Sequence, residues 1–113
     1  MAPHARAKED VKVLRCKGDL NASVMVSIKN QVSKLMNRNR KHVLLDLSKT
    51  EHVDLAGLGI LVERIKKVRA ADGDIKLCNV QPQVSETFRL VGVSKLIESF
   101  KSEDEAIRSF KVA

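Results

Sequence analysis

His42-Val43-Leu44-Leu45-Asp46-Leu47 is an almost continuous apolar stretch, and a glycine-bearing segment follows it closely, Asp54-Leu55-Ala56-Gly57-Leu58-Gly59. The apolar stretch predicts a strand in the interior of a mainly parallel sheet, because such strands are buried on both faces. The second segment predicts the start of an amphipathic helix, whose apolar stripe comprises Leu58, Leu61, Val62, Ile65 and Val68. A loop between a strand and a helix is where α/β domains gather working residues.

Strand and helix patterns alternate through the rest of the chain. Strands are predicted at residues 11–17 and 75–80, with a last short one within residues 96–100. Asn21 is a suitable N-cap for a first helix, whose buried face is predicted to carry Val24, Ile28, Val32 and Leu35. Pro82 suits the first turn of a short helix, and Ser102 with Glu105 forms a capping box before a closing helix. These patterns predict one α/β domain over residues 1–113, with residues 1–8 as a loosely ordered tail.

The composition predicts an aliphatic core and argues against one class of partner. Hydrophobic residues make up 43% of the 113 residues, while aromatic residues make up 3%, with no Trp and no Tyr. A protein that binds single-stranded nucleic acid usually stacks bases on exposed aromatic side chains, whereas the three Phe of this chain are predicted to lie in the core.

The net charge of +7 makes the distribution of cations important. One group follows the first predicted helix and consists of Arg38, Arg40, Lys41 and His42. Cations are favoured there by the negative end of the helix dipole. A second group is predicted on the polar side of the next helix, with Glu63 among it: Arg64, Lys66, Lys67 and Arg69. We interpret both groups as solvated faces and expect no nucleic acid, while an acidic partner and a nucleotide- or nucleic-acid-binding protein stay open as alternatives.

No residue pattern predicts catalysis, a metal or a cofactor. Cys16 and Cys78 are far apart and are predicted to be reduced, buried thiols. The histidines His4, His42 and His52 are scattered without metal-ligand spacing. No nucleophile motif is present, so we do not expect an enzyme. The sequence has no leader pattern and no membrane-spanning run, so the chain is expected to be cytoplasmic and not membrane-embedded.

Asp54 and the glycines after it have a structural and a functional interpretation. As an N-cap, Asp54 would satisfy free amides at the helix start, and the functional alternative adds a role at a recognition surface. Gly57-Leu58-Gly59 lacks the third glycine of a dinucleotide fingerprint and the lysine of a P-loop. We interpret its small residues as room for another backbone to approach a helix start whose amides favour anions.

The order and spacing of these segments resemble the STAS-domain family, whose small free-standing members are bacterial anti-sigma-factor antagonists. Besides the two segments quoted first, the similar stretches are Gly18-Asp19-Leu20-Asn21, residues 75–80 with Pro82, and residues 88–97. The resemblance covers nearly the whole chain. It implies the STAS fold, a small, mostly parallel four- to five-stranded sheet flanked by about four helices, with the N-terminal strand antiparallel.

The resemblance also implies partner switching, in which a kinase-type anti-sigma factor, usually of the GHKL class, binds the unmodified antagonist and releases it on serine phosphorylation. In phosphorylatable members a serine stands directly before the first glycine of the motif, and here that position is Ala56. Leu55 and Asn21 also depart from the serine and the acidic residue usual at their positions. We therefore expect binding without this switch, and Ser48 or Thr50 could be replacement sites.

The site residues implied by the resemblance form a partner-binding surface: Asn21, Asp54, Leu55, Ala56, Gly57 and Leu58. The expected partner is an anti-sigma factor or a GHKL-type kinase in a pathway that controls transcription. The alternative is an accessory subunit of a membrane lipid-transport ATPase or of a stress-signalling scaffold, for which the missing serine is no loss.

Overall fold

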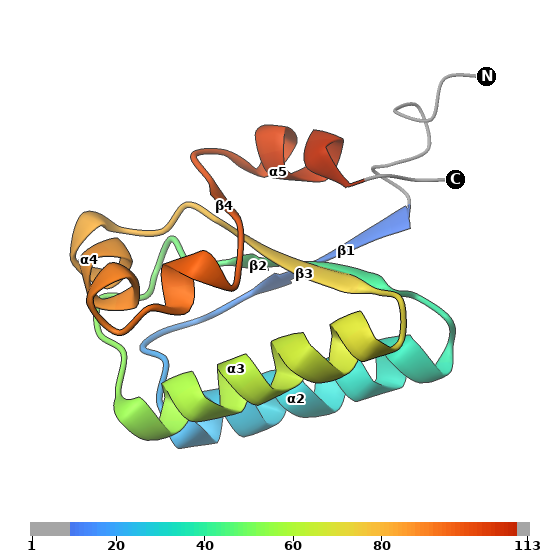
Figure 1. The fold of residues 1–113 in the computed structure, drawn as a ribbon, viewed down its shortest axis with the longest axis horizontal. Coiled ribbons are helices and arrows are strands. Elements are labelled where there is room, and N and C mark those ends of the chain that lie inside the picture. Colours follow the sequence, from blue (N-terminus) through green and yellow to red (C-terminus); the bar gives the residue numbers. More distant parts are fainter. Residues whose placement is uncertain (1–9, 111–113) are drawn as a thin grey trace.

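The computed structural model describes residues 10–110, and strands and helices alternate in it as predicted (Figure 1). The predicted tail at residues 1–8 lies outside the described residues. The strands are β1 (Val11–Arg15), β2 (His42–Asp46), β3 (Asp74–Cys78) and β4 (Ser99–Phe100). The helices are α2 (Ala22–Asn37), α3 (Leu55–Ala70), α4 (Pro82–Leu90), the 3-10 helix η1 (Val93–Lys95) and α5 (Glu103–Ser109). The predicted α/β fold with a parallel sheet is confirmed.

The sheet has the order β1-β2-β3-β4, and every neighbouring pair is parallel. The antiparallel N-terminal strand that the resemblance implied is therefore wrong for β1, which pairs with β2 in parallel with Val11 opposite His42. The reason is the helix between them. A helix that connects two neighbouring strands returns the chain to the edge where the first strand began, so the second strand runs in the same direction.

One face of the sheet is covered by α2 and α3, which lie side by side (Figure 1). Their buried apolar residues are Met25, Ile28 and Val32 from α2, and Leu58, Leu61, Ile65 and Val68 from α3. The other predicted members, Val24, Leu35 and Val62, are only partly buried and pack at the margin of this core. The periodicity therefore placed the right face of each helix against the sheet but did not include Met25.

The opposite face of the sheet is covered by α5 (Figure 1). A second, smaller core forms there from Val11, Leu44, Cys78, Ala106, Ile107 and Phe110. The predicted cap of α5 is confirmed, since the Ser102 hydroxyl accepts a hydrogen bond from the Glu105 amide at 3.1 Å.

One predicted polar residue of α3 is buried. Lys66, Lys67 and Arg69 are exposed as expected, but Arg64 retains only 8% of its accessible surface. Arg64 follows Gly57 by seven residues, so the two lie on the same side of the helix, the side that faces α2. Its Nη1 donates to the Ser33 hydroxyl of α2 across 3.4 Å. The prediction for Arg64 was wrong because its stem is enclosed between two helices.

Candidate functional site

The loops that precede α2 and α3 are hydrogen-bonded to each other at the carboxyl ends of β1 and β2. The Leu20 amide donates to the His52 carbonyl at 3.0 Å, and the Asp54 amide donates to the Leu20 carbonyl at 3.0 Å. Leu20 and Val53 form an isolated parallel bridge. Because of these bonds, two helices that are far apart in sequence begin side by side.

Side-chain hydrogen bonds in both directions also link the two loops. Asp19 accepts hydrogen bonds from the His52 amide at 3.0 Å and the Glu51 amide at 3.1 Å. Both bonds lower the pKa of Asp19 below its usual value, and the bond from the His52 amide has the larger effect. Thr50 is fully buried and donates to the Gly18 carbonyl at 2.7 Å. In the folded chain the Thr50 hydroxyl is thus closed to a kinase, whereas Ser48 is exposed.

Each of the two helix starts has a side-chain cap. The Asn21 Oδ1 accepts from the Val24 amide at 2.9 Å, and the Asp54 Oδ1 accepts from the Gly57 amide at 2.7 Å. Such caps satisfy amides that have no partner within the helix. The capping role predicted for both residues is confirmed. Both side chains also remain exposed.

Gly57, in the first turn of α3, lies against the backbone of the loop that precedes α2. A Cβ atom at this position would lie 2.4 Å from the Leu20 carbonyl oxygen and 3.0 Å from the Asn21 carbonyl carbon. These are backbone atoms, so they cannot rotate away. The backbone that the small residues were predicted to admit is therefore the chain's own, and Gly57 keeps the start of α3 against the start of α2.

The six residues predicted as a partner-binding surface are brought together, but they are not equally accessible. Leu55 is 80% exposed, and Asn21, Asp54 and Ala56 are exposed too. Gly57 and Leu58 are buried beneath them, so they can position the surface but do not reach its outside. We refer to the four exposed residues, Asn21, Asp54, Leu55 and Ala56, as the helix-start surface.

A polar cluster that the sequence reasoning missed lies at the same end of the sheet. Asp46, 5% exposed, accepts from the Arg15 Nη1 at 2.7 Å, from the Ser48 amide at 2.9 Å and from the Asn79 Nδ2 at 3.4 Å. Burial would raise the pKa of Asp46, but the bonds from Ser48, Arg15 and Asn79 outweigh it and the pKa lies below its usual value. The sequence does contain a signal for this cluster, because Asp46 is a lone charged residue inside the apolar run that begins at His42.

Replacing Asp46 by Asn is expected to lower the free energy of unfolding by roughly 1–3 kcal/mol at pH 7, because three hydrogen bonds lose their buried, charged acceptor. A carboxylate whose pKa is lowered by folding stabilises the fold above its unfolded pKa of about 4 and loses this effect as the pH falls through its folded pKa. The difference between wild type and Asp46→Asn should therefore shrink below about pH 4. Urea unfolding at pH 7, 5 and 3 measures it. A difference that stays constant across this range would contradict the argument.

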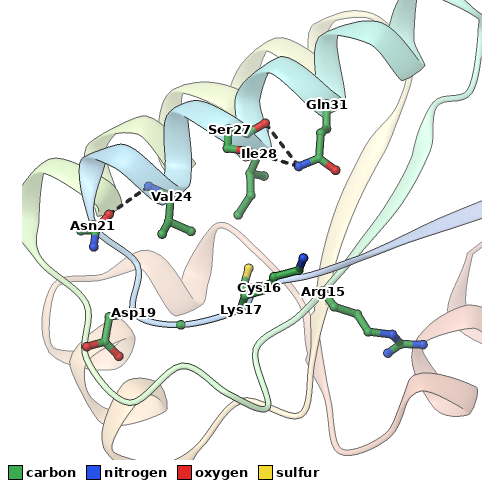
Figure 2. A pocket seen from close by; sticks show the side chains of 10 residues that line it. Arg15, Cys16, Lys17, Asp19, Asn21, Val24, Ser27, Ile28 and Gln31 are labelled. Carbon is green, nitrogen blue, oxygen red and sulfur yellow. Dashed lines mark hydrogen bonds between the residues drawn. The ribbon is translucent and has the colours of Figure 1, made fainter.

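A cleft of about 590 Å³ opens beside the helix-start surface, between the end of β1 and α2 (Figure 2). Figure 2 shows Val24 and Ile28 pointing from α2 toward Cys16, which follows β1, and Ser27 with Gln31 along the helix. The thiol of Cys16 is no nucleophile, because burial and the nearby Asp46 charge raise its pKa to about 12. Cys16 and Cys78 are both free and buried, as predicted.

The part of the chain that the structure describes contains no arrangement of side chains that would indicate a metal site. Among residues 10–110, no three His, Cys, Asp or Glu side chains converge as metal ligands would. No helix in the same range is long and apolar enough to cross a membrane.

Comparison with known proteins agrees with this fold and sequence pattern. A family model described as the STAS domain matches residues 2–106. A Bordetella bronchiseptica protein, BtrV, named as a candidate anti-sigma factor antagonist, is 25% identical over 107 residues, which cover 94% of this chain and 92% of that protein. The anti-sigma F factor antagonist of Paenibacillus polymyxa is 24% identical over 103 residues, covering 90% of this chain and 88% of that protein.

A solved structure is similar over most of the chain. The crystal structure of a candidate anti-sigma factor antagonist from Thermotoga maritima superposes with a TM-score of 0.79 at 23% identity, covering 88% of this chain and 86% of that one. At this identity the likeness establishes the fold.

Proposed function

Because this chain belongs to the STAS domain family, we propose that it is a non-enzymatic module that binds an anti-sigma factor in a cytoplasmic partner-switching pathway controlling transcription. In this proposal it does so without the usual serine phosphorylation. Relatives that align along most of its length are named as antagonists of anti-sigma factors. The helix-start surface is the proposed contact.

The observation that carries the proposal is the environment of Ala56. It is exposed in the first turn of α3, beside Leu55, which is 80% exposed. A partner that covers Leu55 and the methyl group of Ala56 would bury apolar surface, which favours association. A methyl group at position 56 cannot accept a phosphoryl group, so the charge of about −2 that would disrupt such a contact cannot be added there. In this proposal the helix-start surface binds the partner, and phosphorylation at position 56 does not regulate that binding.

A tagged pull-down from the native cell, with mass spectrometry of the captured proteins and of the chain itself, tests the proposal. We expect a kinase-type anti-sigma factor bound to an unmodified chain. Recovery of a transporter ATPase or of scaffold subunits in its place would contradict the proposal. Phosphate on Ser48, which is exposed, would show that the switch has moved.

Restoring the serine should restore the switch. With the captured kinase-type anti-sigma factor and ATP, Ala56→Ser is expected to become phosphorylated and to lose affinity by about tenfold or more, ~1.4 kcal/mol. The wild type should bind equally with and without ATP. Ala70→Ser is the control, because it adds the same hydroxyl to an exposed residue at the opposite end of α3, away from the helix-start surface. Binding measured by titration calorimetry checks this, and ATP-dependent release of the wild type would contradict it.

A second candidate function is favoured by the same residue. An accessory subunit of a membrane lipid-transport ATPase or of a stress-signalling scaffold has a constant partner, and Ala56 fits a contact that is never switched. In that case the same surface would bind a subunit of the assembly. The proteins recovered in the pull-down distinguish the two candidates.

A further inference from the structure

Arg64 is a buried cation that lacks a counter-charge. It retains 8% of its accessible surface, and its Nε is sealed from water without a hydrogen-bond partner. Its one side-chain bond, from Nη1 to the Ser33 hydroxyl, spans 3.4 Å, the long end of the hydrogen-bond range. Within residues 10–110 no carboxylate lies within ion-pair distance of it.

Other cations of the chain show that this is not the general pattern. Arg15, Arg69 and Lys76 each have a carboxylate within 3.4 Å. Glu63, the acidic neighbour of Arg64 in sequence, pairs with Lys67 at 3.5 Å. A buried guanidinium without a counter-charge is costly, and folded chains normally pair such groups. Of the two buried cations among the described residues, Lys76 has a carboxylate partner and Arg64 has none.

A second cation lies on the same side of α2. Lys29 precedes Ser33 by one helical turn, so the two share a face. Lys29 is half-buried and, within the described residues, makes no ion pair. We call Lys29, Ser33 and Arg64 the basic seam, since Arg64 of α3 bonds to Ser33 of α2 and Lys29 lies one turn from Ser33.

We propose that the basic seam is a docking site for a carboxylate side chain of a protein partner. A planar guanidinium matches a carboxylate through two parallel hydrogen bonds, and the pair is strong where water is excluded. The seam runs between α2 and α3, whose first turns carry the helix-start surface, so one protein can cover both (Figure 1). The inference rests on the proposed function only for the identity of that protein.

The site suits an acidic side chain better than nucleic acid. A duplex is held by many phosphate contacts along a row of cations, whereas the seam has only two cations, Lys29 and Arg64. The chain has no Trp or Tyr on which bases could stack.

A hexaglutamate peptide serves as the probe, titrated at about 150 mM salt so that long-range attraction is screened. Arg64→Met keeps the length of the apolar stem and removes the charge, and Arg64→Gln is the second variant. We expect both variants to bind the peptide at least about fivefold more weakly than wild type, since the bidentate pair between guanidinium and carboxylate is lost. Lys66→Gln removes an exposed cation two residues away and should stay within about twofold. The urea midpoint of Arg64→Met should equal or exceed that of wild type.

Four results would overturn the proposal. One is an equal loss for Lys66→Gln and Arg64→Met, which would indicate a general effect of net charge. Another is a lower urea midpoint for Arg64→Met, which would give Arg64 a role in the fold alone. A third is tighter, Arg64-dependent binding of duplex DNA, and the fourth is phosphate on Ser33 of the native protein. None of these depends on whether an anti-sigma factor is captured, so the two proposals fail independently.

Discussion

Gly57→Ala is expected to lower the free energy of unfolding by about 1–3 kcal/mol, as overpacking of a tight contact does. The added methyl group would lie 2.4 Å from the Leu20 carbonyl oxygen and 2.8 Å from its carbon. Both atoms belong to a backbone that is held by bonds to His52 and Asp54. The start of α3 must therefore move away from the start of α2, and partner affinity should fall together with stability.

Gly59 provides a matched control on the same helix. A Cβ atom there would have no neighbour within 4 Å. Gly59→Ala should raise the free energy of unfolding by about 0.5–1 kcal/mol, because alanine loses less conformational freedom in a helix. Urea unfolding followed by circular dichroism measures both, since the chain has no Trp for fluorescence. If both variants shifted stability in the same direction, the close approach at Gly57 would not be the cause.

Ala56→Glu is expected to weaken binding of the anti-sigma factor by about 10- to 100-fold, roughly 1.4–2.7 kcal/mol. A carboxylate added to the exposed first turn of α3 must be desolvated when a partner covers it. Folding should not suffer, because an acidic residue near a helix N-terminus is favoured by the helix dipole. The loss of affinity would therefore reflect a disturbed contact with the partner and not a change in the fold.

Ala70→Glu is the control for this variant. Ala70 is the last residue of the same helix and is exposed, so the chemical change is identical at the opposite end. Its affinity should match that of wild type. Calorimetric titration against the captured anti-sigma factor checks the pair, and equal affinities of Ala56→Glu and wild type would remove Ala56 from the contact.

Much of the fold could be predicted from local patterns. The apolar periodicity of α2 and α3 predicted which face of each helix is buried. The caps at Asn21, Asp54 and Ser102 could be predicted because capping depends on a few consecutive residues. The direction of β1 was not predicted correctly. The resemblance implies an antiparallel strand there, but the helix between β1 and β2 brings the chain back so that the two strands run parallel.

The remaining errors concern contacts between distant segments. Arg64 is polar by type and becomes buried only because α2 lies against that side of α3. The bonds from Arg15 and Asn79 to Asp46 join three separate strand ends. Likewise, the sequence predicted that Gly57 admits a backbone, but which backbone depends on how the two loops meet. Such pairings are set by tertiary packing, which periodicity does not encode.

Binding of a partner at the helix-start surface is tested most directly by an NMR map of the isotope-labelled, unmodified chain titrated with the captured anti-sigma factor in the absence of ATP. The backbone amides of Asn21 and of Asp54 to Leu58 should shift most, with smaller changes along α2 and α3, while α5 on the other face is unaffected. Shifts confined to α5, or no binding until a residue is phosphorylated, would contradict binding at this surface.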